Sequence, residues 1–559
     1  MKFQESSLVF DAFGHILRSG FLPPLTPENK VMTRLKKNKF LRLPVIALVI
    51  FTGSSLLAEK PSVKPNILFV FSDDHAWQSI GAYQSRLKDI ANTPNIDQLA
   101  KEGMLFRKCY VTNALCGPSR ATVLTGKYGH LNGVTWNKKA RFDGSQQTFP
   151  KLMRDHGYET ALIGKWHLGT TPTGFDYFDV MSGQGKYYNP SLNRGDIEGV
   201  HETRTVKGHN SNVVADLSID WLKNGRDKEK PFLLMAQFKA THHGWAPAPE
   251  EYALYDDVVI PEPENLFDDF STRGTAIRNQ TLTLYEDLRE SLLLGDPGEL
   301  GALDPEQRKA WEAYRSKDRR PFEAMGMEWG DSSRELSRFK YQVFMKNFLA
   351  TGAGIDRNVG RIRDFLREHD LAENTIVIYM ADHGFFLGEH GFFDKRFMYE
   401  ESLRTAFIVH WPDVVECGVV NDTDMVSNLD IASTFLDIAG IEIPGDIQGE
   451  SLVPILQGKT PVDWRKTFLY EYFELANHNV PPNTGVTDGR RKLIYYNKTH
   501  EWEFFDLKTD PQEMKSQYYN PEYEETIEGL KQELKRLRSK YKCTSTINFD
   551  YQIQWPYEK

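Results

Sequence analysis

The stretch Asn66-Ile-Leu-Phe-Val-Phe-Ser-Asp-Asp74 is an unbroken apolar run that ends on two adjacent carboxylates. A run without polar alternation is typical of a strand whose two faces are both buried. Such strands belong to parallel sheets covered by helices, where ligands bind beyond the carboxyl ends of the strands. The stretch therefore predicts a central strand of an α/β fold, with Asp73 and Asp74 at its functional edge.

Four further strands are predicted along the chain, over 160–163, 231–238, 375–380 and 406–411. Helices alternate with them. One is predicted from Pro94 to Glu102, with Thr93 as N-cap and Gly103 as terminator, and apolar residues at near-helical spacing predict another over 344–365. We expect an α/β fold with a large, mostly parallel central sheet flanked by helices.

Ionisable residues follow four of these five strands directly. Lys165 and His167 come after the strand at 160–163, and His242 comes after the strand at 231–238. Asp382 and His383 follow the strand at 375–380 in the same way. Because the carboxyl ends of parallel strands share one edge of a sheet, these segments are expected to meet at one site.

The overall composition is that of a globular protein with an acidic charge balance. The chain has 559 residues, 40% of them hydrophobic, and a formal net charge of −9. This charge argues against nucleic acid as a partner, although a locally basic site can still bind an anion.

The C-terminal part of the chain suggests a change of architecture, with antiparallel strands at 492–496 and 502–505 and a helix over 522–540. We expect a catalytic domain over 59–466 and a smaller C-terminal α+β subdomain over 467–559.

The N-terminus has the order of an export signal. Basic residues between Arg34 and Arg42 precede an apolar run over 43–51, and small residues lead to a cleavage site near Ala58. The run is too short for an ordinary membrane span. We expect a leader over 1–58, with a signal peptide at 32–58 and a mis-assigned extension at 1–31. The mature protein would be periplasmic, at the cell surface or secreted, with no stable membrane span.

Four cysteines are too few for a disulfide scaffold, so a cysteine inside a polar motif needs another explanation. Cys116 opens the stretch Cys116-Gly-Pro-Ser-Arg-Ala-Thr-Val-Leu-Thr-Gly126. Pro118 suits the first turn of a helix, and Gly126 suits its end. A helix N-terminus attracts anions, and the guanidinium of Arg120 matches a tetrahedral oxyanion. The stretch therefore predicts an anion site beside Cys116.

The pattern Cys-x-Pro-Ser-Arg, followed by Leu-Thr-Gly, resembles the signature of the type I sulfatases of the alkaline phosphatase-like superfamily. The resemblance runs from about Asn66 into the C-terminal subdomain. It implies that a separate maturation enzyme oxidises Cys116 to formylglycine (3-oxoalanine), whose hydrated aldehyde is the nucleophile. It also implies a sulfuric ester hydrolase that releases inorganic sulfate.

Adjacent carboxylates such as Asp73 and Asp74 repel each other unless a cation binds between them, and hard oxygen ligands suit calcium or magnesium. The resemblance implies one divalent cation, most simply Ca²⁺, bound by Asp73, Asp74, Asp382 and the residue made from Cys116, with His383 as a further candidate ligand. The family often has asparagine after the last aspartate, where this chain has His383. Imidazole is a softer ligand than an amide oxygen, so the identity of the metal stays open.

The resemblance also assigns the groups that bind sulfate and move protons. Arg120, Lys165 and Lys395 would neutralise the sulfuryl oxygens, and His167 would contact the formylglycine hydroxyl. A histidine in Phe238-Lys-Ala-Thr-His-His-Gly-Trp245 would protonate the departing oxygen. Alignment on Lys239 and Ala240 selects His242, while His243 remains the alternative in this register.

The substrate is expected to be a sulfated carbohydrate. The segments Phe393-Asp-Lys-Arg396 and Gly183-Gln-Gly-Lys-Tyr-Tyr-Asn-Pro190 are similar to bacterial N-acetylglucosamine-6-sulfatases. His243, Trp245 and Arg404 are candidate substrate-binding residues, and Tyr187 and Tyr188 would either stack on a sugar or pack in the core. Two alternatives stay open: a phosphoester or phosphonate hydrolase of the same superfamily, and an inactive protein that binds sulfated glycans.

Overall fold

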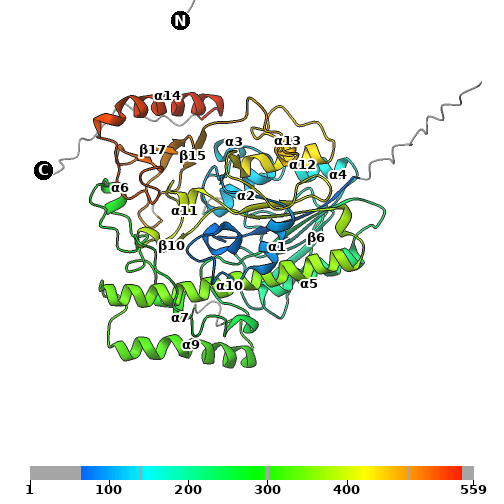
Figure 1. Ribbon diagram of the computed structural model, residues 1–559. Coiled ribbons are helices and arrows are strands. Elements are labelled where there is room, and N and C mark those ends of the chain that lie inside the picture. The colour runs from blue at the N-terminus through cyan, green and yellow to red at the C-terminus, as the bar shows by residue number, and fades with distance from the viewer. Residues whose placement is uncertain (1–63, 138–140, 296–300, 476, 544–559) are drawn as a thin grey trace, which may run out of the picture. The chain divides into compact units, whose positions relative to one another are not determined.

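A computed structural model describes residues 64–137, 141–295, 301–475 and 477–543 (Figure 1). The predicted leader and signal peptide lie outside these residues. In the part of the chain that is described, no helix combines the length and the apolar character needed to cross a membrane.

A ten-stranded sheet runs through the centre of the described chain, in the order β13-β2-β12-β9-β1-β8-β4-β5-β6-β7. Its strands are β1 (Asn66–Ser72), β2 (Met104–Phe106), β4 (Glu159–Gly164), β5 (Tyr177–Met181), β6 (Ser191–Asp196), β7 (Gly199–Thr205), β8 (Phe232–Gln237), β9 (Thr375–Ala381), β12 (Phe407–His410) and β13 (Val419–Asn421). The neighbouring strands β9, β1, β8, β4 and β5 are all parallel. The predicted α/β fold is therefore confirmed, and four of these five parallel strands, β1, β4, β8 and β9, are predicted apolar runs, while β5 was not predicted.

The flanks of the sheet make it mixed. β12 pairs antiparallel with both β9 and β2, and β6 and β7 add an antiparallel hairpin next to β5. β6 ends at Asp196 and β7 begins at Gly199, and a connection this short can join only antiparallel strands. The mostly parallel character that was predicted thus belongs to the centre of the sheet.

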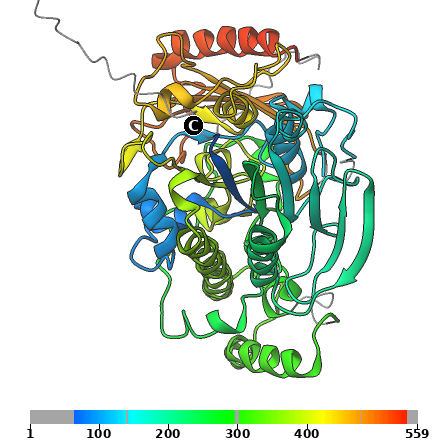
Figure 2. The same cartoon turned by 90° about the vertical axis from the view of Figure 1, so that its right-hand side faces the viewer.

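The alternating side chains of β1 enter two different hydrophobic cores, which explains its unbroken apolar run. Ile67, Phe69 and Phe71 belong to one core, and Leu68 and Val70 belong to the other. The first core contains α2 (Cys116–Thr125), α4 (Phe149–Asp155) and α12 (Ile431–Ile438). The second contains α1 (Pro94–Glu102), α5 (Asn210–Asp220) and α10 (Arg334–Glu368). Helices therefore cover both faces of the sheet (Figure 2).

A second, four-stranded antiparallel sheet follows toward the C-terminus. Its strands are β15 (Phe468–Tyr472), β16 (Asn483–Thr487), β17 (Arg491–Tyr496) and β18 (Glu501–Asp506), and α14 (Glu524–Lys540) packs on it (Figure 1). The strands and the helix predicted in this region are confirmed. The domain boundary at residue 467 remains a prediction, although β15 begins one residue later.

The charged, helix-prone segment before the long helix forms α9 (Pro305–Met325), which lies alongside α10 (Figure 1). The Tyr314 hydroxyl and the Arg315 guanidinium both donate to Asn347 Oδ1 of α10 at 2.6 Å. Asp304 caps the start of α9 in a capping box with Gln307. Neither helix contributes any of the predicted site residues.

Candidate active site

The carboxyl ends of four neighbouring parallel strands deliver the predicted residues to one place. Asp73 and Asp74 follow β1, Asp382 follows β9, Lys165 follows β4, and Gln237 is the last residue of β8. These five side chains are all buried. The expectation that separate polar segments meet beyond the strand ends agrees with this geometry.

Three carboxylates form the centre of the site. Oxygen atoms of Asp73, Asp74 and Asp382 lie within 4.8 Å of one another. Asp74 adopts a left-handed backbone conformation with φ of 60°, which aspartate tolerates better than most residues, and its amide donates to Asp382 Oδ1 at 3.1 Å. The turn after β1 is therefore shaped by the end of β9.

His383 directs an unprotonated ring nitrogen at these carboxylates. Its Nδ1 lies 2.9 Å from the carbonyl oxygen of Gly384, which can only accept, so Nδ1 carries the hydrogen. Its Nε2 then presents a lone pair 3.2 Å from Asp74 Oδ1 and 3.5 Å from Asp382 Oδ1. Burial lowers the pKa of His383 to about 3, so the ring is neutral. A lone pair facing carboxylates fits a cation between them, and the donor set suits a divalent metal.

The ionisation of the three acids follows their surroundings. Burial opposes ionisation of Asp73, but Lys165, His242 and Arg120 outweigh it and hold the pKa of Asp73 well below its ordinary value. Burial raises the pKa of Asp74 to about 6 despite the opposing charge of Lys395. Burial and the neighbouring Asp73 raise the pKa of Asp382 well above its usual range. Two of the three acids, Asp74 and Asp382, are therefore less readily ionised than a free aspartate.

Arg120 joins the strand ends to helix α2. Its guanidinium donates to Asp382 Oδ2 through Nε at 3.2 Å and through Nη2 at 3.1 Å. Its Nη1 donates to Gln237 Oε1 at 2.6 Å and to the Lys165 carbonyl oxygen at 3.0 Å. Sequence reasoning missed Gln237, although it ends a strand that carries a predicted histidine soon after. The Gln237 amide fixes the orientation of the Arg120 fork.

Gly164 allows this close arrangement. Its φ is 108°, and a Cβ atom there would lie 1.9 Å from the Gln237 carbonyl oxygen. Without a side chain, the backbone approaches close enough for the Lys165 amide to donate to that oxygen at 2.8 Å. The glycine thus fixes the backbone position from which the Lys165 side chain extends into the site.

Cys116 is the first residue of α2 and is fully buried. Its Sγ lies 3.9 Å from Asp74 Oδ1, and Gly126 ends the helix in a left-handed conformation, as predicted. The Ser119 hydroxyl donates to the Asp382 carbonyl oxygen and accepts from Asn428 Nδ2 at 2.9 Å. Burial and Asp73 raise the pKa of the Cys116 thiol well above its usual value. An unmodified thiol here is a poor nucleophile.

Two lysines pair with the acids from opposite sides. Lys165 contacts Asp73, and Lys395 Nζ lies 2.8 Å from both carboxylate oxygens of Asp74. Lys395 also pairs with Asp394 at 3.1 Å, and Asp394 in turn contacts Arg396. Burial opposes the charge on Lys395, but Asp394 and Asp74 raise its pKa well above the ordinary value. Asp394 was not predicted, and its signal was only the subfamily phrase around Lys395.

The geometry distinguishes the two adjacent histidines. A ring nitrogen of His242 lies within 4.8 Å of Asp73 and of Cys116 Sγ, and the residue is buried. His243 is exposed. Burial and His243 lower the pKa of His242 well below its usual value, and burial and Lys165 do the same for His167. In the described chain, Nδ1 of both His242 and His167 is buried without a hydrogen-bond partner.

The candidate sugar-binding residues contact aromatic rings and backbone atoms of the protein. Trp245 is fully buried with its ring 4.7 Å from that of Phe344, so it packs in the core. The Arg404 guanidinium lies 4.1 Å above the Trp77 ring. Tyr187 is also buried, and its hydroxyl donates to the His242 carbonyl oxygen at 2.5 Å. Tyr187 thus holds the backbone of His242, and a role of Trp245 or Arg404 with substrate stays a prediction.

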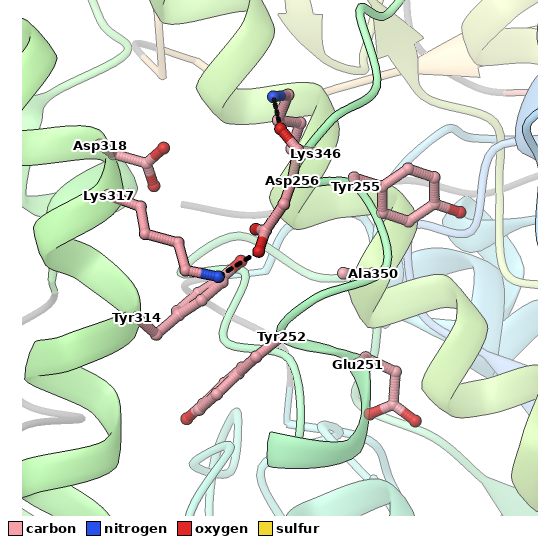
Figure 3. Close-up of a pocket in the computed structure, with 9 residues that line it drawn as sticks. All are labelled: Glu251, Tyr252, Tyr255, Asp256, Tyr314, Lys317, Asp318, Lys346 and Ala350. Carbon is pink, nitrogen blue, oxygen red and sulfur yellow. Dashed lines mark hydrogen bonds and ion pairs between the residues drawn. The ribbon is translucent and has the colours of Figure 1, made fainter.

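A cavity elsewhere in the protein does not belong to this site. It has a volume of about 230 Å³ and lies between α9, α10 and residues 251–256 (Figure 3). Lys317 contacts Asp256 across it, and the rings of Tyr252 and Tyr314 stack at 4.3 Å. Its described walls contain none of the predicted catalytic or metal residues. These paired side chains join α9 to the segment 251–256.

Comparison with known proteins agrees with this geometry. A family model described as "Sulfatase" matches residues 65–441, and one described as "N-sulphoglucosamine sulphohydrolase, C-terminal" matches residues 388–540. An N-acetylglucosamine-6-O-sulfatase from Bacteroides thetaiotaomicron is 40% identical over 540 residues, covering 92% of this chain and 93% of the relative.

Solved structures extend the comparison to the fold. One described as a complex with its substrate D-glucosamine-2-N,6-O-disulfate has a TM-score of 0.81 and 39% identity, covering 86% of this chain and 99% of its own. A phosphonate monoester hydrolase from Silicibacter pomeroyi has a TM-score of 0.64 and 19% identity, covering 85% of this chain and 96% of its own, which is a likeness of fold alone. The chain belongs to the sulfatase family and is a sulfuric ester hydrolase.

Proposed function

We propose that this sulfatase is exported and removes the 6-O-sulfate from N-acetylglucosamine, or from a related 6-sulfated glucosamine, in a sulfated glycan. It would use one divalent cation, most simply Ca²⁺, and a formylglycine made from Cys116 by a separate maturation enzyme. The observation that carries this proposal is the 40% identity, over 92% of the chain, to an N-acetylglucosamine-6-O-sulfatase. The solved relative with a TM-score of 0.81 has a 6-O-sulfated glucosamine as its substrate.

The residues present fit both groups that the family uses. Asp73, Asp74 and Asp382 would hold the cation together with Nε2 of His383, the unprotonated nitrogen that faces two of these carboxylates. The cation supplies positive charge beside the nucleophile, and the hydrated aldehyde at position 116 supplies the attacking oxygen. The unmodified thiol at this position has a raised pKa, which supports a modified nucleophile.

Arg120, Lys165 and Lys395 bind the sulfuryl group in this proposal. Each is almost fully buried, so its charge acts in a region of low dielectric constant. In the structure each is paired with a carboxylate of the site. With those carboxylates engaged by a cation, the three side chains would be available to an anionic substrate and would stabilise charge on the sulfuryl oxygens.

His242 would donate a proton to the departing sugar oxygen, and His167 would assist at position 116. The lowered pKa of His242 keeps its ring neutral before substrate binds. An anionic ester offsets the surrounding positive charge and favours the protonated ring, which makes its proton available when the bond breaks. The buried, unpartnered Nδ1 atoms of His242 and His167 support these roles.

The decisive experiment measures sulfate release from purified enzyme coexpressed with a formylglycine-generating enzyme. The panel contains N-acetylglucosamine 6-sulfate, its 3-sulfated isomer, N-acetylgalactosamine 6-sulfate, a phosphate monoester and a phosphonate monoester. Mass spectrometry of the peptide that contains residue 116 verifies the modification. We expect release from the 6-sulfated glucosamine and inhibition by a chelator.

Faster turnover of the phosphate or phosphonate ester than of any sulfate ester would contradict the proposal. It would instead support the hypothesis of a phosphoester or phosphonate hydrolase, an activity found on the same fold in the phosphonate monoester hydrolase. Binding of sulfated glycans without turnover, with formylglycine verified, would support an inactive binding protein.

A further inference from the structure

An open cleft of about 640 Å³ begins beside His167 and extends away from the sulfate-binding groups. One wall is the segment after β4, from Trp166 to Pro172, and another is the end of β5. Asn193 of β6 and Val200 of β7 contribute from the edge hairpin of the sheet. The volume lies in the range of about 300–1,000 Å³ that is typical of ligand sites. Apart from His167, its described walls contain none of the residues given a catalytic role above.

The cleft joins the active site at the start of helix α2. Asn137 lines the cleft, and its side-chain oxygen accepts from the Gly117 amide at 2.9 Å, next to Cys116. His167 lines the cleft and belongs to the predicted catalytic set. A substrate that places its ester at Cys116 can therefore extend along this cleft.

The chemistry of the walls selects for an anion. Among the described residues that line the cleft there is no aspartate or glutamate, although the chain as a whole has a net charge of −9. Arg141 supplies the one guanidinium on these described walls, and its side chain is exposed. It makes no hydrogen bond or ion pair with any described residue, so its donors are available to a ligand. Val200, which is 45% exposed, provides apolar surface for the C–H face of a sugar.

We propose that this cleft is a subsite for the sugar attached to the 6-sulfated residue, and that Arg141 binds an anionic group on that sugar. The group is a carboxylate or a second sulfate, both of which match the planar fork of a guanidinium. This inference rests on the proposed function and narrows its substrate class to glycans in which the neighbouring sugar is charged. Arg141 acts as a specificity-determining residue and does not touch the ester that is cleaved.

The test compares four substrates that share a 6-sulfated N-acetylglucosamine. One is the free monosaccharide, and in the others this sugar is linked to neutral galactose, to 6-sulfated galactose or to glucuronate. Loss of sulfate from the glucosamine is followed by mass spectrometry. We expect kcat/KM to be about threefold to tenfold higher with an anionic partner than with galactose, mainly through KM. The sulfated and the carboxylated partner separate the two sources of negative charge.

Arg141→Ala should remove this preference and leave kcat/KM for the monosaccharide within about twofold. Arg141→Lys should retain part of it, and Arg320→Ala, which removes an exposed arginine of α9, should retain all of it. High salt should weaken the preference because the contact is exposed. Equal kcat/KM for all partners, or an unchanged preference in Arg141→Ala, would overturn the subsite and leave the proposed function intact. No release from any of the four substrates by the matured enzyme would overturn both.

Discussion

Two clusters of buried charge in this protein differ in how their charged atoms are arranged. The first is the active site, where Asp73, Asp74 and Asp382 face Arg120, Lys165 and Lys395. The second, the Lys492 cluster, consists of Glu400, Lys492 and Glu513 and joins α11 (Glu400–Leu403) to the C-terminal sheet. Lys492 Nζ lies 2.9 Å from Glu400 and 2.8 Å from Glu513, and the Glu400 amide donates to Glu513 at 2.7 Å.

The clusters differ in where their charged atoms point. In the Lys492 cluster one ammonium lies between two carboxylates, so the charged atoms face one another. In the active site the carboxylate oxygens, the Cys116 sulfur and the bare Nε2 of His383 converge on a common region. Buried charge and shifted pKa values therefore occur in both places, and the convergence of several potential metal-ligand atoms is what distinguishes the active site. The following predictions test this contrast, from the largest expected effect to the smallest.

Cys116→Ala should abolish sulfate release, with a loss of about 10⁴-fold or more, because the nucleophile is made from this residue. The thermal unfolding temperature should change by only a few degrees, because the thiol makes one weak contact at 3.9 Å. The matched control is Cys417→Ala, which removes an exposed cysteine and should leave activity unchanged. A folded Cys116→Ala enzyme with full activity would refute the assignment.

Asp382→Asn should separate cation binding from stability. Calcium should raise the unfolding temperature of the wild type. At a concentration a hundredfold above Kd, binding adds about 2.7 kcal/mol to the free energy of unfolding. The variant should lose this shift. Without a cation it should be no less stable than the chelated wild type, because burial raises the pKa of Asp382 and makes its carboxylate unfavourable. An unchanged calcium shift, measured by thermal unfolding with and without chelator, would contradict the metal site.

Lys492→Met should destabilise the fold without touching the chemistry. Removing the ammonium takes the nearest cation from two buried carboxylates and leaves Glu400 only the longer contact to Arg404 at 3.7 Å among the described residues, which costs about 3–5 kcal/mol. We expect the kcat of the folded fraction to stay within about twofold of the wild type. Lys223→Met, at an exposed lysine, should change stability by less than about 0.5 kcal/mol. Denaturant unfolding together with kinetics checks both parts, and a selective loss of kcat would show that the Lys492 cluster serves catalysis.

Glu513→Gln should flatten the dependence of stability on pH. Burial raises the pKa of Glu513 to about 7 from 4.5, so the folded protein holds this proton more tightly than the unfolded chain does. Its stabilising contribution is present below about pH 4.5 and is lost as the pH rises through about 7, a change of about 1–3 kcal/mol. The variant lacks this loss. Denaturant unfolding midpoints at pH 5 and pH 8 test this prediction. Glu522→Gln is the control at an exposed glutamate. Equal changes in midpoint between the two pH values for Glu513→Gln and wild type would contradict the prediction.

Much of the fold was predictable because its central elements carry local signals. The apolar run of β1 and the proline and glycine that bound α1 gave the limits of both elements, and both limits are confirmed. The antiparallel flanks were not predictable, because pairing direction depends on which strands meet and not on their residues. The burial of Trp245 against Phe344 was also hidden, since the two lie 99 positions apart in the chain.

The sequence by itself determined the family, and it predicted the nucleophile position and the set of acids, lysines and histidines, because each sits in a short contiguous motif. Only the tertiary structure decided how they combine. It separated His242 from His243 by burial, and it added Gln237, which orients Arg120. It also joined Asn137 to the helix start and revealed Arg141 in an acid-free cleft. These relations are distances between segments far apart in the chain, and a local pattern carries no distance.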